Sequence, residues 1–125
     1  MGKWEILFVK EVAEWFRDVM KNDPLTADLV GDALDWLADL GPVAGRPLVD
    51  RVKGSRFHHM KELRPGSSGS SEVRILFMLD PRRRAVLLVA GDKAGNWHGW
   101  YRTAIPIAEE RYRAHLAQLD TRRYE

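Results

Sequence analysis

The stretch "ELRPGSSGSSEVRILFMLD", residues 62–80, contains the pattern that decides the fold. A strand-like run ends on Arg64, a loop of Pro, Gly and Ser follows over residues 65–71, and a very apolar run then carries Arg74 near its start. Turn residues between two strand-like runs are typical of a β-hairpin. The pattern therefore predicts adjacent strands over 57–64 and 72–80, with one arginine on each side of the turn.

Alternation along residues 57–64 predicts which side chains share a face, because successive side chains of a strand point to opposite sides. One face carries His58, Met60, Glu62 and Arg64, and the other carries Phe57, His59, Lys61 and Leu63. We expect His59 to be partly buried. Since His58 and His59 point apart, they cannot bind one metal ion together.

The flanking sequence completes an α+β pattern. Residues 4–9 and 85–93 read as strands, and residues 10–21 carry apolar side chains at helical spacing. Asp23 and Pro24 are a typical helix start for residues 24–40. Residues 41–55 read as a loop, and the last helix is expected over 106–119 with Pro106 in its first turn. The predicted order is βααβββα in one domain (1–125), with a mainly antiparallel sheet, helices on one side and a frayed tail over 121–125.

Composition limits the possible functions. The 125 residues include no cysteine, which excludes a disulfide framework, a thiolate nucleophile and a Cys-based zinc site. No signal peptide or membrane-spanning run is visible, so we expect a cytoplasmic protein. Residues 1–50 carry 5 Lys/Arg against 10 Asp/Glu, whereas residues 51–125 carry 15 against 8. This asymmetry indicates an anionic partner such as nucleic acid, or acidic helices that neutralise basic strands.

The predicted order, together with "KELR", "VRILFMLD" and "LLVAGDKAGNWHGWY", resembles the RelE/HigB toxin superfamily, and most closely its phage-derived HigB-like branch. The resemblance implies a RelE-like fold and a ribosome-dependent endoribonuclease that cuts mRNA without a metal or other cofactor, by attack of the RNA 2′-OH on the phosphate. It also implies a cognate antitoxin of helix-turn-helix type. A sister branch, ParE-like, inhibits DNA gyrase instead.

Four residues of the hairpin and the following strand are candidates for catalysis. The resemblance places Arg74 against the scissile phosphate and Lys93 on the RNA backbone. Arg64 suits the same phosphate because a guanidinium is planar and permanently charged. Glu62 could accept the 2′-OH proton if its pKa were raised. Each also has a structural alternative. The alternatives pair Arg74 with Glu72 or a helix carboxylate, Glu62 with Arg64 or Arg74, Lys93 with Asp92, and Arg64 with the second helix.

The segment "AGNWHGWYR", residues 94–102, reads as a Gly-rich aromatic loop. Trp97, Trp100 and Tyr101 can stack on bases, although tryptophans before a helix also plug cores. His98 can act as a general acid or be an ordinary loop histidine. Arg102 and His58 are further RNA-binding candidates. His115 reads as structural, and Arg82, Arg83 and Arg84 read as a solvated turn.

Departures from the family pattern leave three functions open. The N-terminal half is acidic, the 65–71 loop is long, and a double lysine that many relatives carry after the last strand is missing. The first hypothesis is the mRNA endonuclease toxin. The alternatives are a ParE-like gyrase inhibitor and an inactive phage-derived binding module of the same fold.

Overall fold

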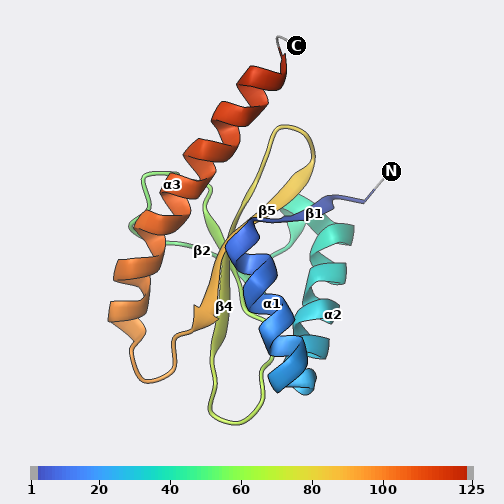
Figure 1. Cartoon of the computed structure of the whole chain (residues 1–125), viewed down its shortest axis with the longest axis vertical. Helices are drawn as coiled ribbons and strands as arrows, with labels where there is room; N and C mark the ends of the chain where they lie inside the picture. Colours follow the sequence, from blue (N-terminus) through green and yellow to red (C-terminus); the bar gives the residue numbers. More distant parts are fainter. Residues whose placement is uncertain (1–2, 124–125) are drawn as a thin grey trace.

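The computed structural model describes the backbone of residues 3–123 and the side chains of residues 3–119. Five strands form one sheet in the order β1-β5-β4-β3-β2 (Figure 1). The strands are β1 (Glu5–Phe8), β2 (Val49–Arg51), β3 (Lys61–Leu63), β4 (Val73–Leu79) and β5 (Arg84–Asp92). Only β1 pairs in parallel, with β5, whereas the other three pairings are antiparallel. This confirms the predicted α+β class with a mainly antiparallel sheet.

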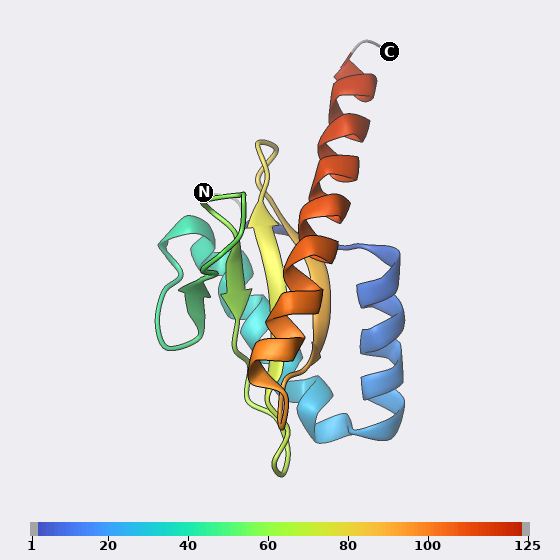
Figure 2. The same ribbon diagram turned by 90° about the vertical axis from the view of Figure 1, so that its left-hand side faces the viewer.

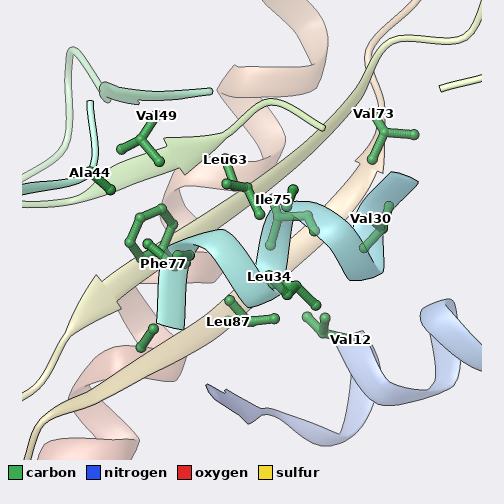
Figure 3. Close-up of a cluster of buried hydrophobic side chains, with 13 residues drawn as sticks. Val12, Val30, Leu34, Ala44, Val49, Leu63, Val73, Ile75, Phe77 and Leu87 are labelled. Atoms are coloured by element: carbon green, nitrogen blue, oxygen red, sulfur yellow. The ribbon is translucent and has the colours of Figure 1, made fainter. Parts of the chain in front are cut away.

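Helices cover both faces of the sheet. Helices α1 (Lys10–Asn22) and α2 (Pro24–Leu40) lie on one face, and α3 (Trp97–Arg123) lies on the other (Figures 1 and 2). Alternation in β4 explains the two layers: Ile75 belongs to the core beneath α2, and Leu76 belongs to the core beneath α3. Figure 3 shows the first core, where Leu34 and Leu87 meet. The prediction of helices on one side was therefore wrong.

The start of α2 confirms the predicted helix cap. The Asp23 carboxylate accepts hydrogen bonds from Thr26 N at 3.3 Å and Thr26 Oγ1 at 2.6 Å, and Pro24 occupies the first helical position. The same carboxylate accepts from Ser68 Oγ at 2.7 Å, and Ser68 N donates to Thr26 Oγ1 at 2.9 Å. The cap of α2 thus also fastens the long 65–71 loop.

The strand predicted over 57–64 is much shorter in the structure. Only residues 61–63 form β3, and residues 49–51, which were predicted to be loop, form β2 beside it. The segment between them turns back tightly, with hydrogen bonds from Val52 N to Met60 O at 3.0 Å and from Met60 N to Phe57 O at 3.1 Å. His58 and His59 lie in this turn and are both exposed, so the partial burial predicted for His59 was wrong.

Helix α3 starts nine residues before its predicted start, so Pro106 lies inside it rather than in its first turn. A proline within a helix cannot donate to the carbonyl four residues earlier, here that of Arg102. Both residues are exposed, so solvent is near that carbonyl. The predicted frayed tail is helical as far as Arg123, and residues 124–125 lie outside the described part. No helix within that part is long and apolar enough to cross a membrane.

A buried ion cluster joins the β4–β5 turn to α3. Asp80 Oδ2 lies 2.9 Å from Arg84 Nε and 2.8 Å from His115 Nε2, while Asp80 Oδ1 accepts from the backbone N–H groups of Arg82 and Arg84. Arg84 is therefore not part of a solvated turn as predicted, although Arg82 and Arg83 are exposed. His115 is buried, which fits the structural role expected of it.

We expect Asp80→Asn to destabilise the fold by about 3 kcal/mol, because removing one partner of a buried pair leaves the other charges uncompensated. Burial disfavours the ionised form, but hydrogen bonds from His115 and from the Arg84 and Arg82 backbone outweigh it and lower the pKa of Asp80 below its usual 3.8. The stability that Asp80 contributes is therefore present above pH 4 or so and lost as the pH falls through the lowered pKa.

Urea unfolding of wild type and variant between neutral and strongly acidic pH measures this difference. The exposed Asp28→Asn is the matched control, for which we expect no change. A constant gap between wild type and Asp80→Asn at every pH would contradict the assignment.

Candidate functional site

The ends of β3, β4 and β5 converge on the first turns of α3. Figure 1 shows β5 leading through a short loop directly into α3. A hollow of about 480 Å³ opens there, with Glu62, Arg64, Lys93, Trp97 and Tyr101 in its walls. The structure therefore brings together predicted residues from three separate segments of the chain.

Glu62 is the central residue of this site, and we call its contacts with Arg64 and Tyr101 the Glu62 hub. Its side chain is 4% exposed, and both oxygens have partners: Tyr101 Oη donates to Oε2 at 2.6 Å, and Arg64 Nε donates to Oε1 at 2.8 Å. Glu62 therefore connects β3 to the first turns of α3. This geometry favours the ion-pair alternative for Glu62 over the role of proton acceptor.

Arg64 is neutralised by carboxylates. Besides Glu62, its Nη2 lies 3.2 Å from Asp50 Oδ2, and Asp50 also lies 3.1 Å from Arg46 Nη2. Arg64 therefore forms a structural ion pair, as the alternative predicted, but its partners lie on β2 and β3 and not on α2. The sequence analysis does not find Asp50 and Arg46, because it predicts a loop over residues 41–55.

Arg74 lies on the same face as Arg64 and Glu62. The β3–β4 pairing ends at Leu63 and Ile75, so Arg64 and Arg74 come next on neighbouring strands and share a face. Arg74 Nη1 donates to the Val73 carbonyl at 2.8 Å, but Nε is buried without a partner. Within the described part of the chain Arg74 forms no ion pair, so the predicted pairing with Glu72 is absent.

Lys93 is buried under an aromatic ring. Its Nζ lies 3.1 Å from the centre of the Trp97 ring, 5.5 Å from that of Tyr101 and 3.9 Å from Glu72 Oε2. Burial, and then the positive charge of Arg74, lower the pKa of the Lys93 amine. The predicted pairing with Asp92 is wrong, because Asp92 Oδ1 accepts from the backbone N–H groups of residues 72 and 94.

The aromatic segment is the start of α3 rather than a loop. Trp100 packs into the core, where a Cβ on Gly91 would come within 2.8 Å of its Nε1, so Gly91 permits this close approach. Trp97, in contrast, is 53% exposed. His98 and Arg102 are exposed on the same helical turns. Trp97, His98 and Arg102 are therefore accessible, whereas Trp100 has the core role that was the alternative for it.

His58 is not brought into the site. It lies in the 52–60 turn and lines a neighbouring hollow with Arg51 and Lys53, while its carbonyl accepts from Arg51 Nη2 at 3.2 Å. It does not share the Glu62 face, because residues 57–60 are not in a strand. Across residues 3–119, no group of three or more His, Cys, Asp or Glu side chains is placed to hold a metal ion.

Tyr101 offers a direct test of the Glu62 hub. Burial, then the hydrogen bond to Glu62 and its negative charge, raise the pKa of the Tyr101 phenol to about 12. Its contribution to stability is therefore complete below pH 10 and is lost as the pH rises through about 12. We expect Tyr101→Phe to cost about 1–3 kcal/mol at neutral pH, because Glu62 loses a buried donor.

The difference in tyrosinate absorbance between wild type and Tyr101→Phe during alkaline titration isolates this phenol. In Glu62→Gln we expect the same phenol to ionise at lower pH. Ionisation of Tyr101 near pH 10 in the wild-type protein would contradict the buried hydrogen bond between Tyr101 and Glu62.

Comparison with known proteins gives consistent matches. The family described as "Phage derived protein Gp49-like (DUF891)" matches residues 14–113. In Mycobacterium tuberculosis, "Putative toxin HigB2" is 49% identical over 112 residues, covering 90% of this chain and 54% of that protein. "Putative toxin HigB3" of the same organism is 47% identical over 116 residues, covering 90% and 93%. The chain thus spans about half of the first relative and nearly all of the second.

Among solved structures, a free double arginine-to-alanine mutant of the E. coli toxin RelE matches with a TM-score of 0.57 at 11% identity, covering 83% of this chain and 96% of that one. This match shows a RelE-like fold, as predicted. The family match over residues 14–113 leads to one conclusion, in line with the two HigB-named relatives: the chain belongs to the Gp49-like family of phage-derived proteins.

Proposed function

We propose that this protein is the toxin of a toxin–antitoxin pair and that it cuts mRNA on the ribosome, in the cytoplasm, by attack of the 2′-OH on the adjacent phosphate. The observation that carries the proposal is Arg74, a cation without a carboxylate partner in the described chain, whose charge acts on Lys93 and Tyr101 in the wall of the hollow. The toxin names of the two Mycobacterium tuberculosis relatives support the biological class.

Arg74 is the phosphate-binding residue in this proposal. Ion pairs with Glu62 and Asp50 already occupy the Arg64 guanidinium, whereas the Arg74 guanidinium has unused donors. When the 2′-oxygen attacks, negative charge grows on the non-bridging phosphate oxygens, and fixed cationic donors stabilise it. Arg64 contributes by holding Glu62, and through it Tyr101, in position.

The reaction needs a proton acceptor and a proton donor. The 2′-oxygen–phosphorus bond forms and the phosphorus–5′-oxygen bond breaks, giving a 2′,3′-cyclic phosphate and a 5′-OH. We assign the 2′-OH proton to Lys93, whose buried amine gives up its own proton more readily than an ordinary lysine because burial and the charge of Arg74 lower its pKa. His98, exposed at the rim, donates a proton to the leaving 5′-oxygen. Tyr101, with a pKa of about 12, stays protonated at neutral pH and orients Glu62.

Trp97 controls access to Lys93 in this mechanism. The ring covers the amine, so it moves aside when the RNA enters and then offers its face to a base. Stacking on an aromatic ring contributes about 1–3 kcal/mol per base without strong sequence preference. An exposed indole above a buried amine thus links base binding to exposure of the proton acceptor.

The same site suggests how an antitoxin silences the protein. An acidic side chain from a partner would pair with Arg74, which has no such pair in the described chain, and would exclude RNA phosphate. We propose a cognate antitoxin of helix-turn-helix type in this role. Such a partner leaves the fold intact and blocks only the site.

We expect Arg74→Ala to lower the cleavage rate by about 10²–10³-fold, the usual effect of removing one donor to transition-state charge. Its stability should be unchanged or higher, because the substitution also removes a buried N–H that has no partner. The matched control is Arg82→Ala, an exposed arginine at the opposite end of β4. Transcript mapping in a cell-free translation reaction measures cleavage, and thermal unfolding measures stability.

Induced expression of the same variants tests the biological role. Growth arrest with translation-dependent cuts in mRNA, lost in Arg74→Ala and kept in Arg82→Ala, supports the proposal. Arrest with DNA damage and intact mRNA would indicate gyrase as the target instead. Full cleavage by Arg74→Ala would contradict the role of this arginine.

A further inference from the structure

A second hollow lies beside the site, between the 52–60 turn and the first turns of α3. Its volume is about 540 Å³, and its walls include Gly54, Arg56, Arg102 and Glu109. His98 and Tyr101 belong to the walls of both hollows, so the two are adjacent. A chain molecule that fills the first hollow can therefore continue into the second.

The surface of the second hollow is cationic. Arg56 and Arg102 are exposed, and neither forms an ion pair with any side chain among residues 3–119. Glu109 is the one carboxylate in the described walls, and it is only 7% exposed. Its Oε2 accepts hydrogen bonds from Arg56 N and from Ser55 Oγ, so it binds the turn rather than facing solvent. The charge offered to a ligand is therefore positive.

The turn that carries Arg56 is fastened to α3. Glu109 holds Ser55 at 3.0 Å, Ser55 Oγ in turn accepts from Phe57 N at 3.0 Å, and the Phe57 ring meets the Tyr112 ring edge-on at 5.2 Å between centres. These contacts fix the backbone at Arg56 before any ligand binds. Preorganisation of this kind lowers the entropy lost on binding.

We propose that the second hollow binds the sugar–phosphate backbone of the RNA strand that flanks the nucleotide held in the site, with Arg56 and Arg102 as its phosphate contacts. The proposal rests on the function proposed above for the identity of the strand. Exposed guanidinium groups on a fastened turn and a helix suit phosphates and carry no base preference. The hollow thus supplies affinity for RNA and not sequence selection.

Messenger RNA and ribosomal RNA share this backbone chemistry. If the strand is the substrate, the hollow contributes to the binding of free single-stranded RNA. If it is ribosomal, the hollow contributes only to the binding of ribosomes. The two sources are distinguished by measuring both.

The test variant combines Arg56→Ala and Arg102→Ala. The matched control combines Arg17→Ala and Arg82→Ala and so removes two exposed arginines elsewhere. The probe is a fluorescent 2′-O-methyl RNA oligonucleotide, which binds but lacks the attacking hydroxyl. We expect the test variant to bind the oligonucleotide at least about tenfold more weakly. The slope of log K against log salt concentration should be smaller by roughly 1.4, because two phosphate contacts are lost at ~0.7 each. Equal behaviour of the two double variants would overturn the proposal.

Sedimentation with vacant ribosomes is the second arm. Loss of oligonucleotide binding with normal ribosome binding assigns the hollow to the substrate strand, and loss of both assigns it to RNA backbone from either source. Loss of ribosome binding alone would overturn the assignment to the flanking strand.

Cleavage in a cell-free translation reaction separates this proposal from the proposed function. If the wild-type protein cleaves mRNA, we expect the Arg56/Arg102 double variant to cleave it with a higher KM. The control double variant should cleave as the wild type does. If wild type does not cleave, the proposed function fails, and the oligonucleotide measurement still decides whether the hollow binds RNA. Circular dichroism of each variant checks that the fold is retained.

Discussion

The site depends on one buried carboxylate. Glu62 accepts from Tyr101 on α3 and from Arg64 at the end of β3, and so it joins the helix that carries the accessible aromatic and basic groups to the sheet that carries Arg74. A carboxylate that is 4% exposed is tolerated only when both oxygens have donors. Because a hydrogen-bonded ion has strict geometry, this pairing also fixes how α3 lies over the strand ends.

Among the side chains of residues 3–119, two charged groups keep a buried atom without a hydrogen-bond partner, Arg74 at Nε and Glu72 at Oε2. At one end of the sheet Asp80 is satisfied by Arg84, His115 and two backbone N–H groups. At the other end Arg64 is satisfied by two carboxylates, yet the neighbouring Arg74 keeps an N–H without a partner. An unsatisfied buried donor costs stability, so it calls for an explanation such as a functional role or a bound water or ion.

Much of the fold follows from local sequence signals, and the misses have identifiable causes. The apolar runs of β4 and β5 and the Asp23–Pro24 start of α2 were predicted because burial and capping leave strong local patterns. Strand β2 was missed because it has only three residues and follows a Gly/Pro-rich stretch, although Val49 and Val52 around Asp50 were a usable β-branched signal. The start of α3 was missed because Pro106 is a strong helix-start signal.

The sequence predicted some of the residues that meet in the candidate site, but not which of them pair with one another. Alternation in the sequence was enough to place Glu62 and Arg64 on one face, because a strand repeats every two residues, whereas the position of Arg74 on that face follows from the Leu63–Ile75 pairing in the structure. No local rule relates Glu62 to Tyr101, which lies 39 residues away, or chooses which arginine is neutralised. That choice depends on Asp50 reaching Arg64 from β2, a strand whose pairing only the folded sheet reveals. The difference between Arg64, which two carboxylates neutralise, and Arg74, for which we propose a role in phosphate binding, thus depends on tertiary contacts.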